Sequence, residues 1–203
     1  MLDPYIRPLI DPPLHTVARH LVNFGLTANR MTFVGFFLGV AAILSIIWKQ
    51  YGLAAFFIAC NRFADGLDGA IARQTELTDF GGFLDIVCDF IIYSGIVFAF
   101  GFMSTQNLLY ASFLIFSFIG PITSFLAYAI IASKRNITSQ KRGKKSFYYL
   151  GGICEGTETA AILILFCLLP EHFNTISFIF AIMCWLTTFG RIYSAWNDFG
   201  AKN

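Results

Sequence analysis

The chain has 203 residues, of which 57% are hydrophobic and 13% charged, and its formal net charge is +2 at pH 7. A typical soluble domain is about half apolar and about one quarter charged. This composition excludes a soluble globular domain, a disordered chain and a basic nucleic-acid-binding protein. The 5 cysteines show neither C-x-x-C spacing nor histidines at zinc spacing, which argues against a disulfide scaffold or a zinc site. The sequence therefore predicts an integral membrane protein.

The first 30 residues differ from the rest of the chain, because prolines interrupt them and no secretory signal is recognisable. After Pro13, apolar side chains recur at helical spacing and polar side chains fall on the opposite face. The apolar residues are Leu14, Val17, Ala18, Leu21 and Val22. This pattern predicts a short helix after Pro13 that lies on the membrane surface. A helix packed on the protein's own core would give the same pattern.

The remaining chain contains six stretches with the roughly 20 mostly apolar residues that a bilayer-spanning helix needs. They are residues 31–49, 51–73, 82–103, 108–133, 150–169 and 173–196. Pro121 predicts a kink in the fourth. The predicted fold is all-α, with six transmembrane helices in one domain (residues 31–203) preceded by an interfacial segment (residues 1–30).

Lysines and arginines are distributed unevenly between the predicted loops, which indicates the orientation of the chain in the membrane. Residues 104–107 and 171–174 contain neither residue type. The basic side chains gather before the first span and between the fourth and fifth, at Arg7, Arg19, Arg30, Lys134, Arg135, Lys141, Arg142, Lys144 and Lys145. We therefore expect an even number of spans with both termini on the cytoplasmic side.

Four carboxylates interrupt the second and third spans near their predicted cytoplasmic ends. Asp65 and Asp68 are three residues apart and Asp85 and Asp89 are four apart, so each pair shares one helix face. The two helices are antiparallel and joined by a short loop, which allows these faces to meet. Acids gathered in a medium of low dielectric repel one another strongly. Hard divalent cations bound through carboxylate oxygens are the natural way to neutralise them.

Nearby bases are too few to neutralise these acids, since only Arg62 and Arg73 are close in sequence. Ionisable side chains inside membrane spans usually serve a function. The segment from Asp65 to Gly69 lacks the alternating ligands of a calcium-binding loop. On the residues alone, a metal centre and a proton or cation carrier both remain open.

The pattern Asp65-x2-Asp68-Gly69-x2-Ala72-Arg73-x7-Gly81-x3-Asp85-x3-Asp89 resembles the signature of the class I CDP-alcohol phosphotransferases. Many members of that family have eight residues where this chain has seven between Arg73 and Gly81. The segment from Leu26 to Thr32 is similar to the family's nucleotide-contacting segment. The whole chain also resembles a bacterial inner-membrane branch of the family, through Lys145-Ser-Phe-Tyr-Tyr-Leu-Gly-Gly and Glu155-Gly-Thr-Glu158-Thr.

This resemblance implies an enzyme that transfers a phosphatidyl group from a CDP-linked donor, such as CDP-diacylglycerol, to an alcohol and releases CMP. It implies that Asp65, Asp68 and Asp85 bind Mg²⁺ or Mn²⁺, and that Asp89 reaches one metal and acts as general base on the acceptor hydroxyl. Nucleotide and diphosphate contacts are expected from Asn29, Thr32, Gly69, Arg73 and Thr78. For Thr32 and Thr78, a helix cap or turn role is an equal alternative.

The acceptor expected from related bacterial enzymes is glycerol 3-phosphate. The branch that uses phosphorylated inositol has arginines where Gly156 and Thr159 stand here, which argues against that acceptor. Glu155 and Glu158 share a helix face and are expected either to line the acceptor pocket or to pair with Arg191. The basic loop (residues 134–145) is expected either to attract anionic lipids or to hold substrate phosphates.

The resemblance also implies a location in a bacterial-type inner membrane with the active site facing the cytoplasm. The implied partners are the lipid bilayer, a CDP-linked lipid, a small alcohol and a second copy of the chain, and nucleic acid is not expected. The rival function is a cation carrier, whose site usually lies near the bilayer midplane between repeated halves. Because no repeat is visible and the acids lie at the membrane edge, we favour the enzyme. A catalytically silent assembly partner would keep costly buried acids without using them.

Overall fold

The computed structural model describes residues 3–135 and 152–200 of the chain, and all secondary structure in this part is helical. The elements in chain order are α1 (Asp3–Asn23), α2 (Ala28–Ile47), α3 (Tyr51–Gln74), α4 (Asp79–Met103), α5 (Thr105–Lys134), α6 (Gly156–Leu168), the 3₁₀ turn η2 (Pro170–His172) and α7 (Phe173–Phe199). The predicted all-α fold is thus confirmed for the described residues.

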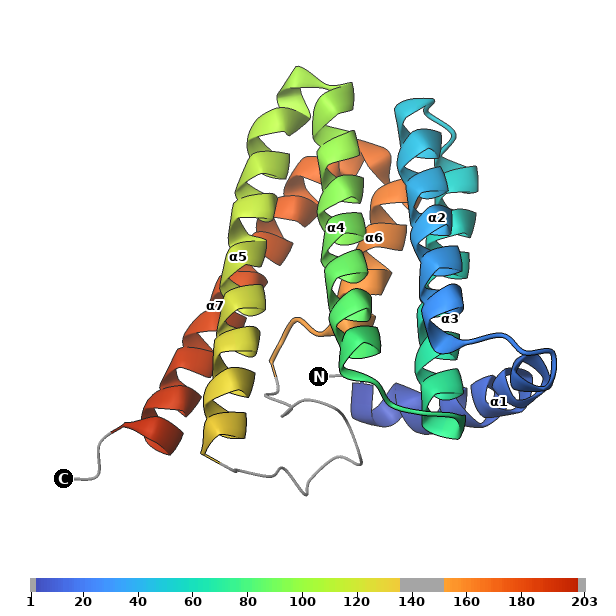
Figure 1. Ribbon diagram of the computed structural model, residues 1–203. Coiled ribbons are helices and arrows are strands. Elements are labelled where there is room, and N and C mark those ends of the chain that lie inside the picture. The colour runs from blue at the N-terminus through green and yellow to red at the C-terminus, as the bar shows by residue number, and fades with distance from the viewer. Residues whose placement is uncertain (1–2, 136–151, 201–203) are drawn as a thin grey trace.

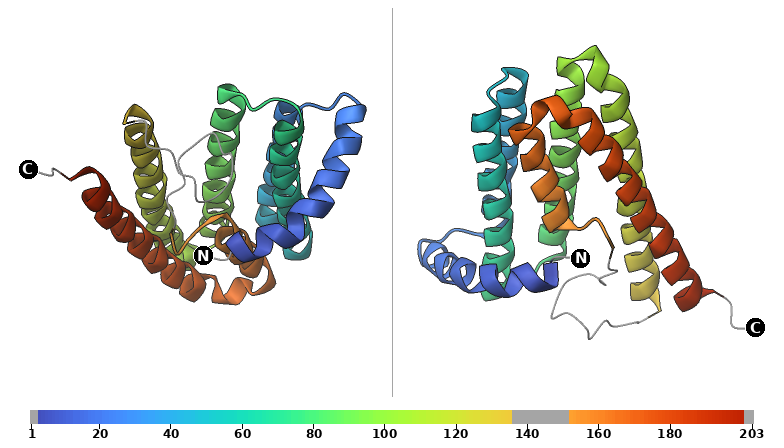
Figure 2. Two further views of the ribbon diagram at one scale, coloured as in Figure 1. Left: turned by 90° about the horizontal axis from the view of Figure 1, so that it is seen from below. Right: turned by 180° about the vertical axis from the view of Figure 1, so that it is seen from behind.

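The long helices form an upright bundle (Figure 1). The helices α2 and α3 pack as one pair and α5 and α7 as another, with α4 in contact with both pairs. The shorter α6 lies behind α4 and packs on α3, as the view from behind shows (Figure 2). The helix α1 crosses the lower end of the bundle beside α3. The C-terminal end of α7 lies at this same end (Figure 1).

Four of the described helical segments are long and apolar enough to cross a membrane, namely α2, α4, α5 and Pro170–Phe199. Large apolar side chains such as Phe37, Phe98 and Ile130 are exposed on these helices and suit contact with lipid. The protein is therefore an integral membrane protein. The two other predicted spans coincide with α3, which carries charged residues, and with α6, which has 13 residues. That α3 and α6 also cross the bilayer stays a prediction.

The predicted start of the first helix after Pro13 is wrong, since α1 already begins at Asp3. Pro4 lies in the first turn, where a backbone N–H has no partner inside the helix. The prolines at positions 8 and 12 follow at intervals of four, so the hydrogen bonds that they remove lie along one side of the helix. On α1, Leu14 and Ala18 are buried against α3, which supports packing on the protein's own core.

The predicted start of the fifth span at residue 150 is also wrong within the described residues, because α6 begins only at Gly156. Residues 152–155 are not helical. Glu155 is in extended conformation at the N-cap of α6, which fixes the first residue of the helix. In α5, the helix continues through Pro121, and the expected kink stays a prediction.

Two glycines on α2 bring α3 and α4 close to it. A Cβ atom at Gly35 would lie 3.3 Å from the Cβ of Ala64 on α3, and one at Gly39 would lie 2.7 Å from Ile92 on α4. A side chain at either position would therefore push the helices apart. This close packing holds α3 and α4 together on the flank of α2, and these two helices carry the predicted acids.

Candidate active site

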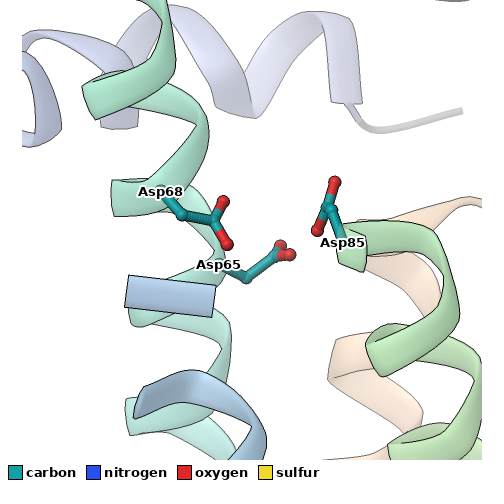
Figure 3. Close-up of side chains that lie close together, drawn as sticks. All are labelled: Asp65, Asp68 and Asp85. Carbon is teal, nitrogen blue, oxygen red and sulfur yellow. The ribbon is translucent and has the colours of Figure 1, made fainter. Parts of the chain in front are cut away.

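Asp65 and Asp68 of α3 and Asp85 of α4 form a three-carboxylate cluster. Each offers one carboxylate oxygen, and these oxygens all lie within 4.8 Å of one another. Figure 3 shows the three side chains pointing toward one another from the two helices. The cluster forms because a spacing of three residues places Asp65 and Asp68 on one face, and the antiparallel α4 presents Asp85 to it. The predicted meeting of the acidic faces is thus observed for three of the four acids.

A hydroxyl group from a third helix orients one member of this cluster. The Thr32 Oγ1 on α2 donates a hydrogen bond of 2.7 Å to the Oδ2 of Asp68. The same hydroxyl lies 3.1 Å from the backbone oxygen of Ala28, one turn earlier. Thr32 and Asp68 are both buried. Of the alternatives for Thr32, the helix cap belongs instead to Thr27, and Thr32 supports a carboxylate.

Asp89, the fourth acid, is held by a different set of partners. Its Oδ1 lies 2.6 Å from the Nη2 of Arg62, and its Oδ2 lies 3.2 Å from the Nη1 of the same guanidinium. The Tyr93 hydroxyl donates a hydrogen bond of 3.0 Å to Oδ2. Asp89 therefore lies beside the three-carboxylate cluster as part of a second group.

The sequence analysis did not find this second group, although the spacing contains a signal for it. Arg62 precedes Asp65 by three residues and Tyr93 follows Asp89 by four, so each lies on the acidic face of its helix. The contact between Arg62 and Asp89 joins residues 27 apart in sequence and depends on how α3 and α4 pack.

The three-carboxylate cluster fits a hard divalent cation. Carboxylate oxygens are the ligands that Mg²⁺ and Mn²⁺ prefer, and the cluster offers three of them in one small volume. Its charge also requires compensation, because among the described residues only one ion pair reaches a member of the cluster, from Arg62 to Asp65 at 3.6 Å.

All four acids line one cavity of about 1010 Å³. This volume is at the upper end for small-molecule sites. The wall of this cavity is built from α1, the start of α2, α3, α4, α5, α6 and α7. The residues predicted to contact the nucleotide all lie on this wall: Asn29, Thr32, Gly69, Arg73 and Thr78.

Two of these residues, Asn29 and Thr78, lie close together where α4 begins. Thr78 is the N-cap of α4 and accepts a hydrogen bond of 3.1 Å from the backbone N–H of Gly81, so its predicted cap role is confirmed. A Cβ atom at Gly81 would lie 3.1 Å from the Oδ1 of Asn29 and 2.9 Å from the Oγ1 of Thr78. The absence of a side chain at Gly81 therefore leaves room for these polar groups at a helix N-terminus, where anions bind favourably.

Arg73 lies over the backbone of its own helix. A Cβ atom at Gly69 would lie 3.3 Å from the Nη1 of Arg73, so Gly69 gives the guanidinium space to approach the helix. Because both residues line the cavity, the arginine places a positive charge on the wall that also carries Asp65 and Asp68.

The two glutamates proposed for the acceptor pocket form a capping box at the start of α6. Glu155 Oε1 accepts a hydrogen bond of 2.9 Å from the backbone N–H of Gly152, and Glu158 Oε2 accepts one of 3.2 Å from the backbone N–H of Glu155. Glu155 lines the cavity, as does Arg191 of α7, which donates a hydrogen bond of 2.7 Å to the backbone oxygen of Pro121. The pairing of the glutamates with Arg191 stays a prediction.

Part of the predicted basic loop lies outside the described residues. This applies to Lys141, Arg142, Lys144 and Lys145, and to the motif that begins at Lys145 as far as residue 151. Their expected roles toward lipid or substrate phosphates stay predictions.

Comparison with known proteins gives a consistent result. The family model for CDP-alcohol phosphatidyltransferase matches residues 25–193. The chain is 46% identical over 197 residues to the inner membrane protein YnjF of Escherichia coli (strain K12), covering 97% of this chain and 96% of that protein. It is 29% identical over 194 residues to archaetidylinositol phosphate synthase of Pyrococcus horikoshii, covering 94% of each.

Two crystal structures of the phosphatidylinositol phosphate synthase PgsA1 from Mycobacterium tuberculosis share the fold. The structure with CDP-DAG bound has a TM-score of 0.73 at 20% identity and covers 94% of this chain and 96% of that one. The complex with manganese and citrate also has a TM-score of 0.73, at 21% identity, with 94% and 92% covered.

Proposed function

The chain belongs to the CDP-alcohol phosphatidyltransferase family, and we propose that it transfers a phosphatidyl group from CDP-diacylglycerol to glycerol 3-phosphate with release of CMP. Family membership makes it an enzyme of phospholipid biosynthesis. The observation that carries the proposal is the three-carboxylate cluster, which opens into the same cavity as the positions expected to contact the nucleotide.

The proposed metal ligands are Asp65, Asp68 and Asp85, and the ion is Mg²⁺ or Mn²⁺. Held by these three carboxylates, such an ion would supply positive charge to offset the charge that develops on the donor diphosphate as CMP leaves. Thr32 holds the carboxylate of Asp68 in a fixed orientation through its 2.7 Å hydrogen bond. The manganese complex of the Mycobacterium tuberculosis protein supports this choice of ion.

The proposed donor side of the cavity consists of Asn29, Gly69, Arg73 and Thr78. The Arg73 guanidinium offers a planar fork of N–H donors that suits phosphate oxygens. Gly69 leaves room for it, and the α4 N-terminus at Thr78 adds backbone donors. The CDP-DAG bound structure that shares this fold supports a CDP-linked lipid as donor.

In the proposed reaction, a carboxylate oxygen of Asp89 takes the proton from the acceptor hydroxyl while the oxygen of that hydroxyl forms the new bond to phosphorus. The bond between this phosphorus and CMP breaks at the same time, and CMP leaves with the electron pair. Arg62 and Tyr93 place two hydrogen bonds on Oδ2 of Asp89 and one on Oδ1, and a carboxylate offers about four acceptor positions, so Oδ1 keeps one for the proton. In this proposal Asp89 also reaches one metal.

The proposed acceptor side lies at α6 and α7. Arg191 is buried and lines the cavity, which favours an acceptor that carries a phosphate. Glu155 lines the same region, but its Oε1 already accepts the backbone hydrogen bond from Gly152, so this oxygen is engaged in capping. These two features support glycerol 3-phosphate over a neutral or amine-bearing alcohol.

Inositol phosphate is the second candidate acceptor, because two similar proteins are named for inositol phosphate lipids. Against it, Gly156 and Thr159 stand where that branch has arginines, and both line the cavity. We place the enzyme in an inner membrane, as the name of its Escherichia coli relative suggests, with both termini and the active site cytoplasmic. We also propose a homodimer.

The test is release of CMP by the purified protein in detergent with Mn²⁺ and CDP-diacylglycerol. Glycerol 3-phosphate, inositol phosphate, inositol, serine, choline and ethanolamine are compared as acceptors. Asp68→Asn removes a proposed metal ligand and should lower turnover about 100-fold or more, since even supporting residues of metal sites cost 10–100-fold. Asp79→Asn is the matched control, because Asp79 is an exposed acid in the first turn of α4, the helix that also carries Asp85. Equal loss in both variants, or no CMP with any acceptor, would contradict the proposal.

A further inference from the structure

Arg62 occupies the space between the three-carboxylate cluster and Asp89. Its Nη1 lies 3.6 Å from the Oδ2 of Asp65, whereas its Nη2 lies 2.6 Å from the Oδ1 of Asp89. Its side chain is only 14% exposed, and its guanidinium lies 4.7 Å from the centre of the Tyr93 ring. One cation therefore contacts one acid of each group, closely in the one case and loosely in the other.

The surroundings of Arg62 hold it in this position. The Nε of Arg62 donates a hydrogen bond of 2.8 Å to the Oδ1 of Asn61, and Nη1 also donates to the Tyr93 hydroxyl. Asn61 is itself buried and fixed, since its Nδ2 donates a hydrogen bond of 2.8 Å to the backbone oxygen of Gly35. Donors on both edges of the guanidinium are thus engaged, which an incidental surface contact does not achieve.

This arrangement has a direct electrostatic consequence for a divalent ion. A guanidinium near Asp65 competes for its oxygen and repels a second cation placed among the three carboxylates. It also balances part of the acidic charge when no ion is bound, which the buried carboxylates require. A cation that replaces Arg62 at Asp65 has to disturb the longer contact of 3.6 Å, while the contact of 2.6 Å to Asp89 can persist.

We propose that Arg62 is a positioning residue that acts as the internal counter-ion of the site, holding Asp89 apart from the three-carboxylate cluster and competing with the divalent ion for Asp65. This inference rests on the metal site proposed above. Arg62 therefore weakens metal binding and at the same time keeps Asp89 in place for the acceptor hydroxyl. A residue that only packs the helices together would have the opposite effect on the metal, because its loss would loosen the cluster.

The test measures Mn²⁺ binding to the full chain in detergent without substrates, from the electron paramagnetic resonance signal of free Mn²⁺. Arg62→Gln should bind Mn²⁺ at least tenfold more tightly than the wild type, and its turnover at saturating Mn²⁺ should fall at least tenfold. Arg62→Lys keeps the charge and should bind within about threefold of the wild type. Arg73→Gln removes the same charge further along α3 and should change the affinity less than Arg62→Gln does.

A second pair of variants covers a failure of Arg62→Gln to fold. In Asp89→Asn, the acid that holds Arg62 is neutral, and adding Arg62→Gln should again tighten Mn²⁺ binding relative to Asp89→Asn alone. Unchanged or weaker binding after removal of Arg62 in either background, or equal tightening in Arg62→Lys, would overturn the inference. A wild type that binds no Mn²⁺ would instead overturn the metal site of the proposed function.

Discussion

Among the described residues, the hydroxyl of Thr32 makes the only hydrogen bond from α2 to the three-carboxylate cluster. Because this hydrogen bond goes to a carboxylate, its loss removes an interaction of about 1.5–3 kcal/mol. The residue thus links a helix without acids of its own to the geometry of the proposed metal site.

Thr32→Val, which keeps the shape of the side chain, should therefore weaken Mn²⁺ binding about tenfold. The measurement is the Mn²⁺ affinity of the purified protein without substrates. Thr123→Val is the control, because Thr123 is exposed on α5 and its hydroxyl bonds the backbone oxygen of Ile119 one turn earlier. A similar change in affinity in both variants would contradict a specific role for Thr32.

At the scale of single residues, the sequence predicted that the acids meet but not their division into two groups, and the nucleotide contacts stay predictions. Asp65, Asp68 and Asp85 meet because helical spacing fixes their faces. The pairing of Asp89 with Arg62 depends on how α3 and α4 are each rotated and placed on α2, which the spacing along one helix does not determine. The same limit applies to Glu155 and Glu158, whose capping role depends on where α6 begins.

Among the elements, α6 owes its first turn to the capping box of Glu155 and Glu158. Such caps are typically worth about 1 kcal/mol. Glu158→Ala should lower the temperature of thermal unfolding and leave the KM for the acceptor unchanged, since only Glu155 is among the described residues that line the cavity. Glu155→Gln should lower the KM for glycerol 3-phosphate, because it removes a negative charge that repels the acceptor phosphate from the cavity wall. An unchanged KM in both variants would exclude the acceptor pocket at this helix end.

The contact between α2 and α4 depends on Gly39. A Cβ atom there would lie 2.7 Å from Ile92, so Gly39→Ala should destabilise the protein by about 1–3 kcal/mol through overpacking. Ile92→Ala alone should cost about 2–5 kcal/mol, and the double variant should lose less stability than the sum of the two single losses, because the atoms that the new methyl group meets are then gone. Thermal unfolding of the single and double variants measures the coupling.

Gly52→Ala provides the control for this pair, because a Cβ atom at Gly52 on α3 meets nothing within 4 Å. It should leave the unfolding temperature unchanged or raise it slightly, since alanine favours the helix. A loss equal to that of Gly39→Ala would mean that the close approach of α2 and α4 is not the cause.

The elements themselves were largely predictable, because long apolar stretches leave little choice but helices in a membrane. Four of the predicted spans meet the length and composition of a membrane helix. The start of α1 was missed because prolines usually end helices, whereas four prolines lie inside α1. The start of α6 was missed because apolar composition does not reveal a cap.

For the whole molecule, metal binding should couple to stability. A ligand that binds only the folded state stabilises it by about 2.7 kcal/mol when its concentration is 100 times Kd. Mn²⁺ should therefore raise the unfolding temperature of the wild type in a saturable manner, and removal with EDTA should reverse the effect. Asp68→Asn should show a much smaller shift, and an equal shift in this variant would place the ion elsewhere.

The cavity joins walls of different chemistry. The acids lie on α3 and α4, while Phe118, Ile122 and Phe125 of α5 and the start of α6 complete the enclosure. In the proposed function, the acids of α3 and α4 carry out the reaction, and residues of α6 and α7 select the alcohol. Substitutions on α6 or α7 should then alter which alcohol is joined without disturbing how it is joined, so this architecture lends itself to diversification from a constant catalytic wall.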